Sequence, residues 1–134
     1  MKHLIYVLLA ALVFLCSCHR SLDEQILLET QNYTRKECPK KLDEYTVLDS
    51  LTYTFNDSVR IHSCHYSVSG MLDNDSVYTP DIIEGFRENV LTDIRTNLDY
   101  RRLRQHQVTF TFHYRSATKP NTEYLCLTFK PEEY

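Results

Sequence analysis

The fold is decided by 79-TPDIIEGFRENVLTDIRTNL-98 and, a short way beyond it, 108-VTFTFHY-114. In the first stretch, apolar residues recur every four positions from Ile82 to Leu98, which is the spacing of one helix face. Thr79 is placed to cap this helix, and Pro80 would occupy its first position. In the second stretch, apolar and polar residues alternate with the period of a β-strand. The two stretches predict a long helix packed on a sheet.

Sequence patterns on either side of these two stretches predict the other helices and strands. Ser21–Lys36 reads as a helix because Ser21 and Glu24 have the spacing of a capping box. Residues 46–55 and 59–68 predict one antiparallel hairpin, and residues 108–114 and 124–129 predict a second. In the first strand, Val47, Leu51, Tyr53 and Phe55 share one face, interrupted at Asp49.

These elements predict an α+β fold, with a four-stranded, mainly antiparallel sheet built from two hairpins. One long helix would pack on a face, and an N-terminal helix would be added to it. The uncovered face would carry a Thr-rich set of side chains: Thr109, Thr111, His113, Cys126 and Thr128.

The first residues have the features of an export signal. A positive start precedes an apolar run from Leu4 to Leu15, which is too short to span a bilayer core. The following Leu15-Cys16-Ser17-Cys18 resembles the lipobox of bacterial lipoproteins, and that resemblance implies acylation, such as palmitoylation, of Cys18. We therefore expect a signal peptide over 1–17, a lipidated N-terminus and tether helix over 18–36, and a single domain over 37–134.

The same segment predicts a location. The protein would be anchored by lipid in the cell envelope, with the membrane as a partner through that lipid. Because His19, Arg20 and Ser21 follow the Cys rather than an acidic run, the outer membrane facing the periplasm is favoured.

Composition excludes several function classes. The chain has 15 Lys and Arg against 18 Asp and Glu, so nucleic acid is not an expected partner. It has only 2 glycines, which leaves no Gly-rich phosphate loop and no nucleophile elbow. No cofactor is expected. No metal site is expected either, because His62 and Cys64 share a face while His65 faces the other way, and a zinc site needs three or four ligands.

Three cysteines remain in the expected domain: Cys38, Cys64 and Cys126. Export permits a disulfide, so one bridge with one free thiol is an option, and three pairings are open. Three buried thiols are the alternative.

Two further features suggest chemistry. Cys38 lies among Lys36, Lys40 and Lys41, which could lower the pKa of its thiol and make it reactive. Arg101, Arg102 and Arg104 follow the long helix and are candidates for anion binding, although cations near a helix C-terminus are also ordinary.

A broader resemblance rests on several loose motifs. They are Cys38-Pro39, Leu42-Asp43, Leu48-Asp49-Ser50, the strand Val108–Tyr114, and Phe129-Lys130-Pro131 before Tyr134. Together they resemble an uncharacterised group of small exported α+β proteins with an N-terminal Cys-Pro, over residues 36–134. The resemblance supports the fold and implies no catalytic residue. Cys64 stands where that group would have an aromatic residue.

The sequence thus predicts a bacterial envelope lipoprotein that acts as a non-enzymatic binding module for an envelope protein or glycan. Two alternatives stay open. One is a thiol-dependent redox activity at Cys38, and the other is inhibition of an envelope hydrolase.

Overall fold

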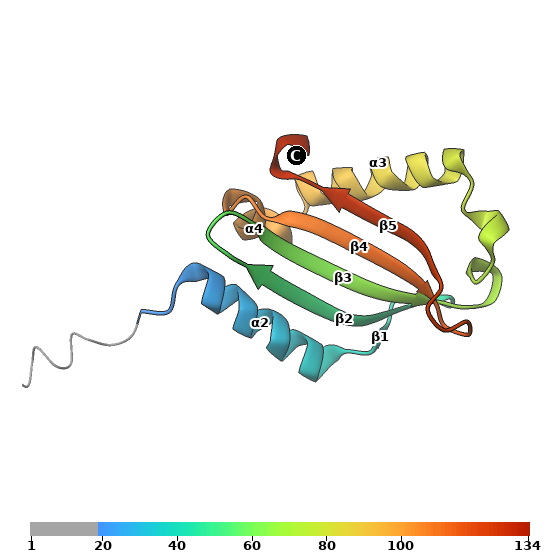
Figure 1. Cartoon of the computed structure of the whole chain (residues 1–134), viewed down its shortest axis with the longest axis horizontal. Helices are drawn as coiled ribbons and strands as arrows, with labels where there is room; N and C mark the ends of the chain where they lie inside the picture. Colours follow the sequence, from blue (N-terminus) through green and yellow to red (C-terminus); the bar gives the residue numbers. More distant parts are fainter. Residues whose placement is uncertain (1–18) are drawn as a thin grey trace, which may run out of the picture.

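The computed structural model describes residues 19–134, and the predicted signal peptide and Cys18 lie outside them. In this part of the chain, five strands form one sheet in the order β1-β2-β3-β4-β5 (Figure 1). The strands are β1 (Lys40–Lys41), β2 (Thr46–Phe55), β3 (Arg60–Val68), β4 (Thr109–Ser116) and β5 (Glu123–Phe129). The helices are α2 (Leu22–Glu37), α3 (Pro80–Thr96) and α4 (Arg101–Gln105). The α+β class is therefore confirmed.

The predicted strand count and helix content differ from the structure in detail. The sheet has a fifth strand, β1, which pairs antiparallel with Val47 and Leu48 of β2. A second addition is α4, which lies between α3 and β4. Both were missed because two lysines and an Arg-rich turn carry no apolar period; their backbone is ordered by neighbours rather than by their own sequence.

The two predicted hairpins are joined by a crossover. β2 with β3, and β4 with β5, pair antiparallel as predicted. Between the hairpins, β3 and β4 run parallel. This is possible because α3 returns the chain to the end of the sheet at which β3 begins, so that β4 starts at the same end. The sheet is thus mixed, with antiparallel pairs in the majority.

Both long helices pack on the same face of the sheet. Ile26 of α2 and Ile94 of α3 are almost fully buried, and both belong to one core with the inward side chains of the strands. Large members of that core from the strands are Leu48, Tyr53, Phe110, Phe112, Leu127 and Phe129. The other face of the sheet has no helix on it within the described residues (Figure 1).

The first turn of α2 is attached firmly to the sheet. Asp23 accepts hydrogen bonds from Tyr53 at 2.7 Å and from Arg60 at 2.9 Å, and its carboxylate lies 2.8 Å from His106 Nε2. Burial acts to raise the pKa of Asp23, but these three hydrogen bonds outweigh it and lower the pKa to about 2. The helix expected as a tether over 18–36 is therefore packed in the domain, with the predicted capping box of Ser21 present.

Two β-bulges change which side chains face the core. In β2, the pairing skips Asp49, so Leu48 is buried at 7% exposure and Val47 is only partly covered. The prediction that Val47 shares a face with Leu51 and Tyr53 is therefore wrong, because the extra residue at Asp49 shifts the alternation. In β5, the pairing skips Tyr124. As a result Glu123 lies on the same face as Cys126, although residues three apart in a regular strand face opposite ways.

Among the described residues, no helix combines the length and apolar character needed to cross a membrane.

Candidate functional site

A groove of about 370 Å³ lies between α2 and the sheet. Its floor is formed by inward side chains of β2 and β3, and one wall by α2. The other wall is formed by residues 97–103, which comprise the turn after α3 and the start of α4. The groove is lined by both aromatic and polar side chains, which is typical of pockets that hold small organic ligands.

His62 provides the most informative group in the groove. The residue is 6% exposed, and its Nδ1 atom is buried with no hydrogen-bond partner among residues 19–134. Burial lowers the pKa of His62 to about 4, so the imidazole is neutral at physiological pH. Because buried polar atoms are almost always hydrogen-bonded in native proteins, an unpartnered one that lines a groove indicates a place for a ligand group.

Tyrosines, a cysteine and an ion pair also line this groove. Tyr66 and Tyr100 are largely covered, and burial raises the pKa of both hydroxyls, so they remain protonated donors. Burial also raises the pKa of the neighbouring Cys64 thiol to about 12, which keeps it protonated. At the mouth, the exposed Glu29 and Arg102 form an ion pair across the groove, from α2 to α4.

The three arginines predicted as anion-binding candidates have different surroundings. Arg102 reaches the groove and pairs with Glu29. Arg104 donates to the carbonyl oxygens of Ile94 and Asn97 at the end of α3. Arg101 is exposed. The structure thus does not gather them into one cluster.

The three predicted thiols form no disulfide within the described part of the chain, and they are dispersed. Cys64 lies on the helix-covered face and Cys126 on the open face, so the sheet separates them. Burial, together with the charges of Asp49 and Glu37, raises the pKa of the Cys38 thiol. This is opposite to the shift expected from the neighbouring lysines.

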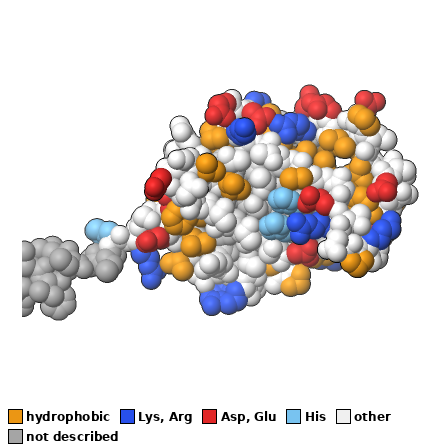
Figure 2. Space-filling model, in the orientation of Figure 1, with side chains coloured by type: hydrophobic (Ala, Val, Ile, Leu, Met, Phe, Trp, Pro, Cys, Tyr) orange, Lys and Arg blue, Asp and Glu red, His pale blue; other side chains and the backbone are white. Residues whose placement is uncertain are grey.

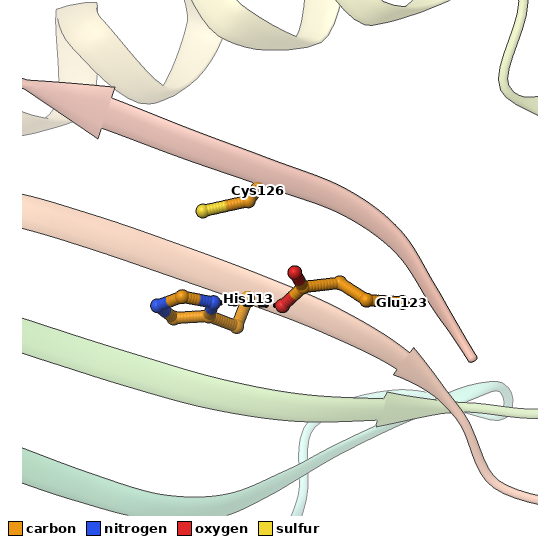
Figure 3. Close-up of side chains that lie close together, drawn as sticks. All are labelled: His113, Glu123 and Cys126. Carbon is orange, nitrogen blue, oxygen red and sulfur yellow. Dashed lines mark hydrogen bonds and ion pairs between the residues drawn. The ribbon is translucent and has the colours of Figure 1, made fainter. Parts of the chain in front are cut away.

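The open face carries a second group of chemically active side chains. Figure 2 shows histidines near its middle, beside acidic and basic side chains. His65 of β3 and His113 of β4 are paired in register and stack at 4.9 Å between ring centroids. His113 Nδ1 lies 2.7 Å from Glu123 Oε1, and Cys126 projects beside them from β5 (Figure 3).

Two parts of these sites were not found from the sequence. The groove depends on α2 packing beside the turn between α3 and α4. No local sequence pattern indicates how far apart these two segments lie in the folded chain. Glu123 was missed because only the bulge at Tyr124 turns it toward Cys126. The Thr-rich uncovered face was predicted with the correct members, because strand alternation alone assigns them.

Fold and groove together define a small α+β domain with a ligand-sized groove under an N-terminal helix. The chain belongs to the family of a domain of unknown function, DUF8479, whose model matches residues 21–125. This match includes α2, consistent with its packing in the domain. None of the curated proteins matches the chain in sequence.

A solved structure with the same fold comes from Pseudomonas aeruginosa. It is a crystal structure described as that of a "putative secreted protein (PA3611)". The two chains share 15% sequence identity, and the TM-score is 0.60. The match covers 85% of this chain and 97% of the other. At this identity the likeness supports the fold alone.

Proposed function

We propose that this chain is an exported, lipid-anchored binding protein of the bacterial cell envelope. In this proposal, the groove under α2 holds a saccharide unit of an envelope glycan. The lipobox-like Leu15-Cys16-Ser17-Cys18 supports anchoring through Cys18. The likeness to a protein described as secreted is consistent with an extracytoplasmic location.

The observation that carries the binding role is the imidazole of His62 in the lining of the groove, whose buried Nδ1 has no hydrogen-bond partner among the described residues. Leaving a buried polar atom without a partner costs about 1–3 kcal/mol. A ligand hydroxyl would recover that free energy if the His62 ring turned Nδ1 toward the groove, because the atom is covered in the unliganded chain. The groove volume of about 370 Å³ is at the small end of the usual range for ligand pockets, which suits a single ring.

A saccharide fits the chemistry of the lining. Its hydroxyls both donate and accept, and the groove supplies acceptors on Glu29 and Asp99 and donors on Arg102 and Asn97. Its ring also has apolar C–H faces, which Tyr33 and other tyrosines of the lining can cover. The ion pair of Glu29 and Arg102 at the mouth can reorganise at little cost, because both side chains are about half exposed.

The alternatives receive less support. A reactive thiolate at Cys38 requires a lowered pKa, whereas the pKa of this thiol is raised. Inhibition of an envelope hydrolase stays a prediction, and no described contact favours it over glycan binding.

The test is co-sedimentation of the purified chain with the insoluble glycan sacculus of bacterial envelopes. His62→Phe should weaken binding by about tenfold, because it removes the buried hydrogen-bonding group. His65→Phe is the matched control: it is the same change on the same strand, but on the opposite face. Equal binding by wild type and His62→Phe would refute the assignment to this groove.

A further inference from the structure

We propose that His113, Glu123 and Cys126 form a binding site for a Zn²⁺-class divalent metal on the open face of the sheet. This site is separate from the groove under α2, which lies on the other face, so each can fail without the other. It uses residues that the sequence analysis placed in no metal site.

The first argument is distance. The ligand atoms of the three side chains all lie within 4.8 Å of one another. With metal–ligand bonds of about 2.0–2.3 Å, a tetrahedral site needs ligand atoms about 3.3–3.8 Å apart. This difference is within the reach of side-chain rotation, since both Glu123 and Cys126 are exposed. His113 Nδ1 and Glu123 Oε1 lie 2.7 Å apart, so this pair must separate slightly when a metal binds between them.

The second argument is that the backbone holds the three residues together. His113 and Cys126 are direct partners across the antiparallel strands β4 and β5. The bulge at Tyr124 then brings Glu123 onto the same face. Bulges often occur where a strand must redirect a functional side chain. The three ligands therefore come from a rigid sheet rather than from a loop (Figure 3).

The third argument is the support around the imidazole. His65 stacks on the His113 ring with an interplanar angle of 10°, and its own Nε2 lies 3.1 Å from Thr52 Oγ1. Stacking restricts rotation of the His113 ring and so reduces the entropy that metal binding would cost. Arg115 Nε lies 3.5 Å from Glu123. Its side chain is 56% exposed, so it can move into solvent when a cation binds.

The donor set selects the class of metal. One imidazole nitrogen, one carboxylate oxygen and one thiolate sulfur suit Zn²⁺ and its neighbours, whereas Ca²⁺ and Mg²⁺ prefer oxygen ligands alone. Three protein ligands leave the fourth position of a tetrahedral site for water. The proton released by the Cys126 thiol on binding goes to solvent.

The test is titration of the full, purified chain with Zn²⁺, measured by calorimetry under reducing conditions. We expect one saturable site per chain. Cys126→Ser and His113→Gln should each weaken it by about 100-fold or more, since loss of even an outer partner of a metal site costs about 10–100-fold. His65→Gln changes the neighbouring imidazole, which supports the His113 ring but lies outside the ligand set, so it should weaken binding by less, about tenfold.

Absorption of the Co²⁺-loaded chain gives an independent readout. A sulfur-to-cobalt charge-transfer band should be present in wild type and absent in Cys126→Ser, with unchanged circular dichroism showing that the variant is folded. Absence of saturable Zn²⁺ binding would overturn the proposal. Equal affinity in wild type and Cys126→Ser would also overturn it, as would loss of binding in His65→Gln as complete as in His113→Gln.

Discussion

Mild acid should destabilise this protein through a single buried imidazole. His62 is 6% exposed, and burial lowers its pKa from the ordinary 6.5 to about 4. In the unfolded chain the same imidazole is in water and titrates near 6.5. Between these two values the unfolded state binds a proton that the folded state does not, so stability falls as the pH is lowered.

The magnitude follows from the two pKa values. The contribution of neutral His62 is fully present above pH 6.5 and is lost as the pH falls through about 4. Each tenfold difference in proton affinity is worth about 1.4 kcal/mol, so the whole loss is about 3 kcal/mol. At about pH 4.5, roughly 2–3 kcal/mol of it should already be gone. This is a substantial fraction of the roughly 5–15 kcal/mol that stabilises a typical domain.

The assay is urea unfolding of wild type and His62→Phe at pH 7 and pH 4.5. The wild type should lose roughly 2–3 kcal/mol more than the variant on acidification, because Phe cannot take up a proton. Burial and the neighbouring His113 and Arg115 also lower the pKa of His65, but that contribution is common to both proteins and cancels. Equal losses in the two proteins would refute the reasoning, since the imidazole would then be solvated in the folded state.

Two further predictions concern the attachment of α2 and the thiols. Asp23→Asn should lower the free energy of unfolding at pH 7 by about 2 kcal/mol, because three hydrogen bonds to a charged acceptor are weakened. The control Asp57→Asn, at an exposed position, should have little effect. Similar urea midpoints for the two variants would contradict this prediction. In the native protein, a maleimide should label the exposed Cys126 readily. It should spare Cys64, which is 3% exposed and should react only after unfolding. Equal labelling rates for the two thiols, measured by mass spectrometry, would contradict the fold.

Local patterns in the sequence were sufficient for most secondary structure. The capping box at Ser21 and the Thr79-Pro80 start both set helix N-termini that the structure confirms. These signals succeed because a cap acts on backbone groups within three residues. The alternation in β4 and β5 assigned inward and outward side chains for the same reason: the period is a property of the strand itself.

The bulges, the short elements and the two candidate sites were decided by tertiary structure. A bulge depends on how two strands pair, so neither Asp49 nor Tyr124 reveals it in sequence. The two lysines of β1 form a strand only because β2 offers them a free edge.

The amino-acid sequence therefore determined the α+β class, most helices and strands, and which side chains of the β4–β5 hairpin point to each face of the sheet. Only the tertiary structure placed α2 beside the α3–α4 turn, which created the groove around His62. It alone brought Glu123 to His113 and Cys126. The physical reason is range: caps and periods act over a few residues, whereas both sites join side chains whose proximity depends on strand register and helix packing.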